Sequence, residues 1–80
     1  MIDDQTTYVN GYGIEPWADL AGANLAGTNL RRADLAVAYL AGVNLRGANL
    51  GGGYFRGAFA DEDTIWPEGF DPGTAGVIFE

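Results

Sequence analysis

The chain has 80 residues and a formal net charge of −7 at neutral pH, so it forms at most one small domain with an acidic surface. This charge argues against binding to nucleic acid or to an anionic membrane, which both require a basic surface, although it would suit a basic partner. The simplest role of the acidity is solubility. With no cysteine, no membrane-spanning stretch and an acidic start at Asp3 and Asp4, we expect a cytoplasmic protein without membrane insertion.

Residues 1–17 form the first segment, which precedes the repetitive part of the chain. Asn10 and Gly11 stand between two groups of β-favouring residues. An Asn-Gly pair in this setting is typical of a tight turn, so the sequence predicts a β-hairpin over residues 8–14. The segment ends at Trp17, immediately before the repeats begin.

From residue 18 to residue 62 the sequence repeats itself every five residues, in nine consecutive copies. The copies read ADLAG, ANLAG, TNLRR, ADLAV, AYLAG, VNLRG, ANLGG, GYFRG and AFADE. The first place holds a small residue, the second mostly Asp or Asn, and the fifth mostly Gly. The third place holds the side chains that we expect to form the structural core, which are Leu20, Leu25, Leu30, Leu35, Leu40, Leu45, Leu50 and Phe55.

The five-residue period excludes the two ordinary secondary structures. On an α-helix, positions five apart rotate by roughly 140°, which would distribute the leucines around all faces. On a long strand, an odd step would place successive leucines on opposite faces. A short extended piece followed by a corner fits the pattern, because the first and third residues then face inward and the glycine supplies the bend. Each repeat is therefore predicted to form one side of a coil.

The tandem Ala-(Asp/Asn)-Leu-x-Gly pattern resembles the pentapeptide-repeat proteins, and it covers 45 of the 80 residues. The resemblance implies an all-β fold, a right-handed quadrilateral β-helix with four repeats per coil. Nine repeats would then make about two coils, with non-repeat caps at both ends. The outward Asn side chains would bond the turn backbone and belong to the scaffold.

The segments outside the repeats, 1–17 and 63–80, are expected to close the open ends of the coil, as terminal units of solenoids generally do. The expected cover of the N-terminal end is Trp17 with Tyr12 and Ile14, and the expected cover of the C-terminal end is Trp66 with Phe70. The C-terminal segment also resembles the closing segment of many short pentapeptide-repeat proteins, which are especially abundant in cyanobacteria.

Three repeats carry an aromatic residue at the outward second place, where Asp or Asn is usual, and these are Tyr39, Tyr54 and Phe59. If four repeats make a coil, Tyr39 and Phe59 stack on one side and Tyr54 lies on the neighbouring side. Such an apolar patch is covered either by the N-terminal segment or by a partner. We treat the three residues as a candidate partner surface.

The residue types missing from the chain predict that it is not an enzyme. Without His, Cys, Ser or Lys, it has no common nucleophile–base pair, no Schiff-base lysine, and no thiolate or imidazole metal site. Asp61, Glu62 and Asp63 form the densest carboxylate cluster, but they lack the spacing of a calcium loop. A filled coil also offers no substrate cleft. We therefore predict no catalytic residue, no metal and no cofactor.

Two classes of function remain. A structural or protein-interaction module is favoured, which binds a protein partner or a second copy, for example through exposed strand ends. Residues 77–79 are apolar enough to add a strand to an edge, either on this chain or on another. The alternative is an acidic DNA mimic that acts on a DNA-binding protein such as gyrase, as some pentapeptide-repeat proteins do. Two coils at about 4.8 Å per level make a rod of only about 10 Å, which argues against mimicry.

Overall fold

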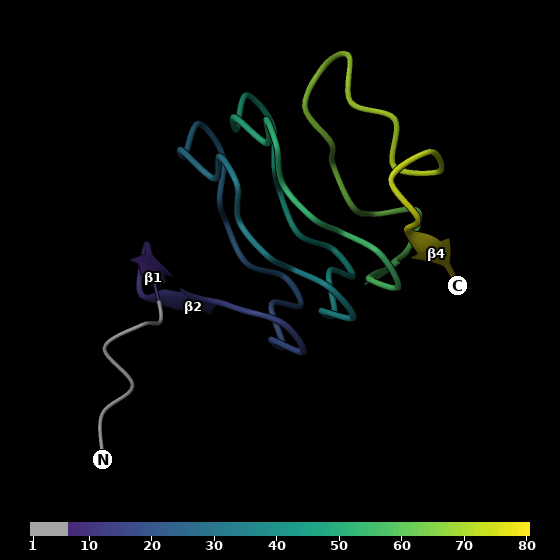
Figure 1. The fold of residues 1–80 in the computed structure, drawn as a ribbon, viewed down its shortest axis with the longest axis horizontal. Helices are drawn as coiled ribbons and strands as arrows, with labels where there is room; N and C mark the ends of the chain where they lie inside the picture. Colours follow the sequence, from purple (N-terminus) through teal and green to yellow (C-terminus); the bar gives the residue numbers. More distant parts are fainter. Residues whose placement is uncertain (1–6) are drawn as a thin grey trace.

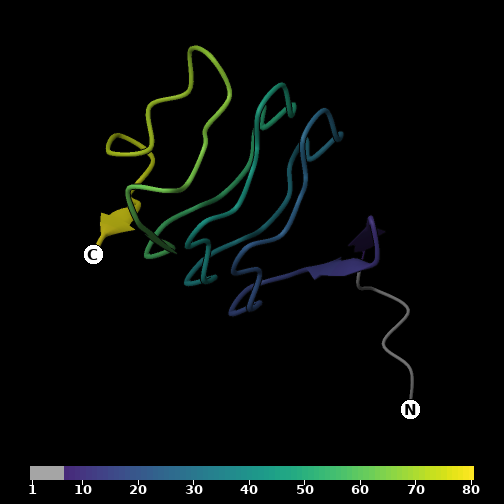
Figure 2. The same ribbon diagram turned by 180° about the vertical axis from the view of Figure 1, so that it is seen from behind.

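The computed structural model describes residues 7–80, and the regular structure of this part consists only of β-strands and isolated β-bridges. The strands are β1 (Thr7–Val9), β2 (Tyr12–Ile14), β3 (Phe59–Ala60) and β4 (Ile78–Phe79). The chain winds in coils that stack along one axis, with the β1–β2 hairpin at one end and β4 at the other (Figures 1 and 2). The expected all-β fold is thus confirmed for the described residues.

The predicted hairpin is confirmed, and its turn has the expected conformation. β1 and β2 pair antiparallel, with Val9 opposite Tyr12. The two turn residues both have positive φ, 52° at Asn10 and 82° at Gly11. This combination matches the right-handed twist of the flanking strands, and Asn and Gly adopt it at low cost.

Parallel pairing between residues twenty apart builds the coils. Asp19 pairs with Tyr39, and Tyr39 with Phe59. The same step joins Asn24 to Asn44, Asn29 to Asn49, and Asp34 to Tyr54. Twenty residues are four repeats of five, so successive repeats lie on four sides, which we name the first (Asp19), second (Asn24), third (Asn29) and fourth (Asp34) side.

Most corners are held by the outward side chain that precedes them and by a left-handed fifth residue. The side-chain oxygen of Asn24 accepts the Ala26 amide hydrogen at 3.2 Å. Five more second-place residues make the same bond to the residue two positions on, namely Asp19, Asn29, Asp34, Asn44 and Asn49. In the first eight repeats the fifth places have positive φ and are glycines, except for Arg32 (62°) and Val37 (60°). The scaffold role predicted for the outward Asn residues is confirmed.

The interior contains the side chains of the third and first places. The eight expected core residues are each at most 7% exposed, and Leu25, Leu35, Leu40 and Leu45 are fully buried. Small first-place residues such as Ala38, Val43 and Ala58 are fully buried beside them. Burial of this kind, together with the ladder of main-chain bonds between coils, stabilises the stack.

The C-terminal segment closes the stack with three aromatic rings. Trp66 stacks on Phe70 with centroids 5.2 Å apart, and Phe70 contacts Phe55 edge-on at 5.3 Å. The coil step lengthens to 21 residues here, since Asn44 pairs with Ile65. Buried Thr64 occupies the first place of this side, and its hydroxyl donates to the Leu40 carbonyl oxygen at 2.8 Å. The pairing therefore continues beyond the nine repeats, with one extra residue.

β4 returns to the first side and adds a further level. It pairs in parallel with β3, with Ile78 opposite Phe59 and Phe79 opposite Ala60. The Ile78 amide donates to the Ala58 carbonyl at 2.8 Å. The strand predicted for residues 77–79 is confirmed in part, because residues 78 and 79 add to an edge of their own chain.

The expectation that Trp17 covers the N-terminal end of the coil is wrong, because its side chain is 77% exposed. Trp17 stands five residues before Gly22, has a φ of 67°, and donates its amide hydrogen to the Ala36 carbonyl at 3.0 Å. It therefore occupies a fifth place, and the side chains of corner residues point away from the interior. Of the other two residues expected in this cover, Ile14 at the end of β2 is buried as predicted, whereas Tyr12 is exposed.

Candidate partner-binding surface

The first side carries a ladder of outward apolar side chains. Asp19, Tyr39, Phe59 and Ile78 follow one another through direct parallel pairing, so they occupy successive levels of one side. Tyr39 is 40% exposed and Ile78 is 48% exposed, while Phe59 between them is partly buried. We call Tyr39, Phe59 and Ile78 the apolar ladder.

Tyr54 extends the apolar surface around one corner of the coil. It lies on the fourth side, where it pairs with Asp34, and it is 51% exposed. The corner between the fourth and first sides carries Trp17 and Val37 at fifth places one coil apart. The candidate residues Tyr39, Phe59 and Tyr54 therefore lie on adjacent sides, with two further apolar residues at the corner that joins them.

Residues 7–17 do not cover this surface. The hairpin lies at the N-terminal end of the stack (Figure 1), where the Asn10 side-chain amide donates to the Asn24 carbonyl of the second side at 3.1 Å. Tyr39 and Tyr54 remain exposed. The expected cover by the N-terminal segment is therefore wrong for these residues, and residues 1–6 of that segment lie outside the described part.

Carboxylates border the apolar ladder. Asp19 is the neighbour of Tyr39 at the preceding level, and Asp61 and Glu80 directly follow the paired residues 60 and 79. The Tyr39 side chain lies near the Glu80 carboxylate. The negative charge of Glu80 is the main cause that raises the pKa of Tyr39, and Asp61 and Asp19 raise this pKa further. The electrostatic potential at Tyr39 is thus negative.

An aromatic ring at a second place gives up a bond that the scaffold uses elsewhere. The Asp or Asn oxygen there accepts an amide hydrogen two residues on, at 3.0–3.2 Å. A tyrosine hydroxyl stands too far from its own backbone to replace this acceptor, and phenylalanine has none. The aromatic residues are therefore not explained by the needs of the coil.

Trp17 and Ile78 are members of this surface that sequence reasoning did not assign to it. The signal for Trp17 was its spacing, five residues before Gly22, which marks a corner position. The signal for Ile78 was absent, because the repeat has lapsed before residue 78 and only the return of β4 to the first side places it there.

Comparison with known proteins identifies the family. A family model described as pentapeptide repeats matches residues 17–52, with eight copies of the repeat. The chain belongs to the pentapeptide-repeat family. Its structure is similar to the crystal structure of a pentapeptide repeat protein from Nostoc Pcc 7120, with a TM-score of 0.52 and 25% identity, over 80% of this chain and 82% of that one. This likeness shows a β-helix solenoid. No curated protein sequence matches the chain significantly.

The carboxylate cluster at residues 61–63 of this pentapeptide-repeat protein contributes hydrogen bonds to the fold. One Asp61 carboxylate oxygen accepts the amide hydrogens of Gly42 and Asp63, both at 3.0 Å. The same oxygen lies 3.2 Å from the Thr64 hydroxyl. Within residues 7–80, no three carboxylates gather in a group that could hold a metal ion.

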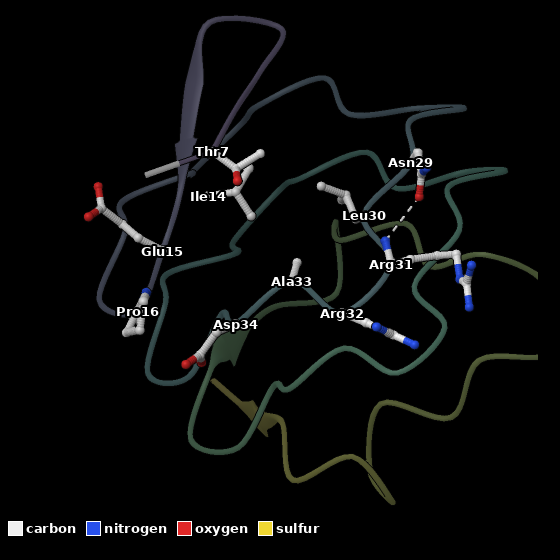
Figure 3. Close-up of a pocket in the computed structure, with 10 residues that line it drawn as sticks. All are labelled: Thr7, Ile14, Glu15, Pro16, Asn29, Leu30, Arg31, Arg32, Ala33 and Asp34. Carbon is white, nitrogen blue, oxygen red and sulfur yellow. Dashed lines mark hydrogen bonds between the residues drawn. The ribbon is translucent and has the colours of Figure 1, made fainter. Parts of the chain in front are cut away.

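A hollow of about 400 Å³ lies between the hairpin and the first coil of the pentapeptide-repeat protein (Figure 3). It is lined by Thr7, Ile14, Glu15, Pro16 and residues 29–34. In Figure 3 the Glu15 carboxylate and the Arg31 guanidinium lie on opposite sides of it. This lining carries side chains of both charges. Residues 7–80 also contain no helix with the length and apolarity that a membrane crossing requires.

Proposed function

We propose that this pentapeptide-repeat protein is a non-enzymatic interaction module. In this proposal, residues 18–62 form a right-handed four-sided β-helix of about two coils, and residues 1–17 and 63–80 are its caps. The scaffold presents Tyr39, Tyr54 and Phe59 to a protein partner. Family membership supports a structural or interaction role of this general kind.

The observation that carries the proposal is the replacement of turn-forming residues by exposed rings. A hydrogen bond of the kind that Asn24 and Asn49 make contributes about 0.5–1.5 kcal/mol to stability. Tyr39 and Tyr54 forgo it and expose apolar area to water. Aromatic residues are enriched where proteins bind other proteins, because a rigid ring buries a large area on binding.

Self-association is a second form of the same proposal, since a second copy is also a protein partner. A single 8.4 kDa species at high concentration in sedimentation would exclude it. The DNA-mimic alternative finds no support in the comparisons, and we do not propose it. The cytoplasmic location stays a prediction.

The proposal is tested by affinity capture from the native cell with three forms of the protein. The first is the wild type, and the second is Tyr39→Asn with Tyr54→Asn, which restores the usual repeat residue at both places. The third is Tyr8→Asn, which removes an exposed tyrosine of the hairpin and serves as the matched control. Captured proteins are identified by mass spectrometry, and thermal unfolding is measured for each form.

We expect a partner that the wild type and Tyr8→Asn capture equally and that the Tyr39→Asn/Tyr54→Asn form does not. This form should be at least as stable as the wild type, because each asparagine regains a turn hydrogen bond. Capture that is unchanged in the Tyr39→Asn/Tyr54→Asn form would contradict the proposal. A large loss of its stability would instead show that the rings serve the fold.

A further inference from the structure

The two corners that flank the first side differ in charge. Beyond one edge, Asp61 and Glu80 stand at successive levels, since the Glu80 amide donates to the Ala60 carbonyl at 3.0 Å. Exposed Glu62 follows in the same turn. Beyond the other edge stands Arg56, whose backbone lies against Gly76.

The remaining arginines of the chain are placed on other corners. Arg31 and Arg32 lie between the third and fourth sides, and Arg46 lies between the second and third sides. The first side therefore combines exposed rings with a mostly acidic border, to which Asp19 adds a carboxylate at the first level.

The corner beside the ladder holds two large residues in a strained conformation. Trp17 and Val37 have φ values of 67° and 60°, whereas Gly57 occupies the equivalent place one coil later. A left-handed conformation is unfavourable for a non-glycine residue, and it is least favourable for a β-branched one. Glycine would remove this cost, so the repeat alone does not account for the two apolar side chains beside the exposed ladder.

We propose that the first side binds a basic, extended segment of the partner, whose Arg or Lys side chains lie over Tyr39 and pair with Asp19 and Glu80. The inference rests on the proposed function and names the chemistry of its partner. Arginine stacks on an aromatic face and pairs with carboxylates, which is the combination that this side offers. The four levels from Asp19 to Ile78 span about 14 Å, the length of about four residues of extended chain.

A second copy of this chain is the less favoured occupant of this surface. A symmetric contact places the same patch of both copies face to face. The carboxylates of Asp19, Asp61 and Glu80 would then oppose each other, and like charges in contact disfavour association. A basic segment would instead be attracted to the same carboxylates.

The test titrates the intact protein with synthetic peptides of about eight residues, enough to cross the side. One peptide alternates arginine with alanine, and matched peptides carry glutamate or glutamine in place of arginine. Binding is followed by amide chemical shifts in nuclear magnetic resonance spectra and by calorimetry. The variants are Tyr39→Asn and the double form Asp19→Asn/Glu80→Gln, in which the new asparagine can still accept the turn hydrogen bond. The control Glu15→Gln/Glu68→Gln removes two exposed charges elsewhere.

We expect the arginine peptide alone to bind, with the largest shifts at Tyr39, Phe59 and Ile78. Tyr39→Asn should weaken binding about five-fold or more, because the cation loses its ring. Asp19→Asn/Glu80→Gln should weaken it about three- to ten-fold, and the control double form less than about two-fold. Raising the salt from about 0.05 M to about 0.5 M should weaken peptide binding to the wild type. It should also reduce the difference in affinity between the wild type and Asp19→Asn/Glu80→Gln.

Equal binding of the three peptides, shifts away from the first side, or equal weakening by the border and control forms would overturn the inference. If the protein is a dimer that Tyr39→Asn dissociates, and if it shows no preference among the peptides, the surface binds a second copy and the inference is also overturned. If the arginine peptide fails while affinity capture still depends on Tyr39 and Tyr54, the interaction module stands and the basic partner is rejected. If capture is also unaffected, both proposals fail.

Discussion

The eighth repeat offers a quantitative test of packing, because it exchanges its two inward residues together. Its third place holds Phe55 where the preceding repeats have leucine, and its first place holds Gly53 where the other repeats have a side chain. A Cβ atom at Gly53 would lie 2.7 Å from Cε2 and 3.2 Å from Cζ of Phe55. The glycine thus makes room for the phenylalanine ring, which contacts Phe70 and Trp66 in the cap.

We predict that the effect of Gly53→Ala on the free energy of unfolding changes sign with the residue at position 55. In the wild type it should destabilise by about 1–3 kcal/mol, since the methyl group overlaps the Phe55 ring. In a Phe55→Leu background the site resembles that of Ala48 and Leu50, and alanine should stabilise by about 0.4–1 kcal/mol by restricting the unfolded chain. The methyl group would also lie 3.0 Å from the Leu50 carbonyl oxygen. Ala48 and Gly53 donate the same 3.0 Å main-chain hydrogen bond to the leucine three residues before them, so the repeat accepts alanine at this place.

Urea unfolding of the four forms, followed by far-ultraviolet circular dichroism, completes the double-mutant cycle. The expected coupling free energy between positions 53 and 55 is about 2 kcal/mol. For a chain of this size, 1 kcal/mol corresponds to a shift of about 4–8 °C in the unfolding midpoint, so thermal scans provide an independent reading. A Gly53→Ala effect of the same size and sign in both backgrounds would refute the packing argument.

Three further predictions address the corner, the cap and the ladder. Val37→Gly should stabilise by about 1 kcal/mol in urea unfolding, because it relieves a left-handed valine with φ of 60°; destabilisation would contradict this. Thr64→Val should cost about 1–3 kcal/mol in the same assay, because the Asp61 amide loses the hydroxyl that accepts its hydrogen and the Leu40 carbonyl loses one of its two donors; no change would contradict it. Glu80→Gln should lower the raised pKa of Tyr39 toward its ordinary value near 10 in an ultraviolet absorbance titration. Because the pKa of Tyr39 is higher in the folded than in the unfolded state, protonated Tyr39 adds stability to the folded state below pH 10, and this stability is lost as the pH rises through the folded-state pKa. A Tyr39 pKa that does not move in Glu80→Gln would contradict the assigned cause.

The repeat made much of the fold predictable from sequence. A five-residue period with an inward leucine and a corner glycine permits few regular structures, so the coil and its interior follow from local geometry. The hairpin followed from Asn10 and Gly11, whose shared preference for positive φ selects its turn. These features depend on residues that are close in sequence.

The features that sequence reasoning missed depend on which coil positions meet in space. Trp17 is apolar, and hydrophobicity alone favours burial, but its corner position turns it outward. The step of 21 residues at Ile65 is accompanied by hydrogen bonds of Asp61 and Thr64. The five-residue repeat does not predict these bonds. Glu80 reaches Tyr39 only because β4 returns to the first side.

The central claim is that residues twenty apart lie side by side on the coil, and engineered disulfides test it most directly because the chain has no cysteine. Asn29→Cys/Asn49→Cys joins two paired outward positions at about 4.8 Å, within the range that a disulfide bridges. The matched form Asn29→Cys/Asn44→Cys places the thiols on different sides. Under mild oxidation we predict rapid intramolecular crosslinking of the 29/49 form and little in the 29/44 form. Equal crosslinking of both, or preference for the 29/44 form, would contradict the coil.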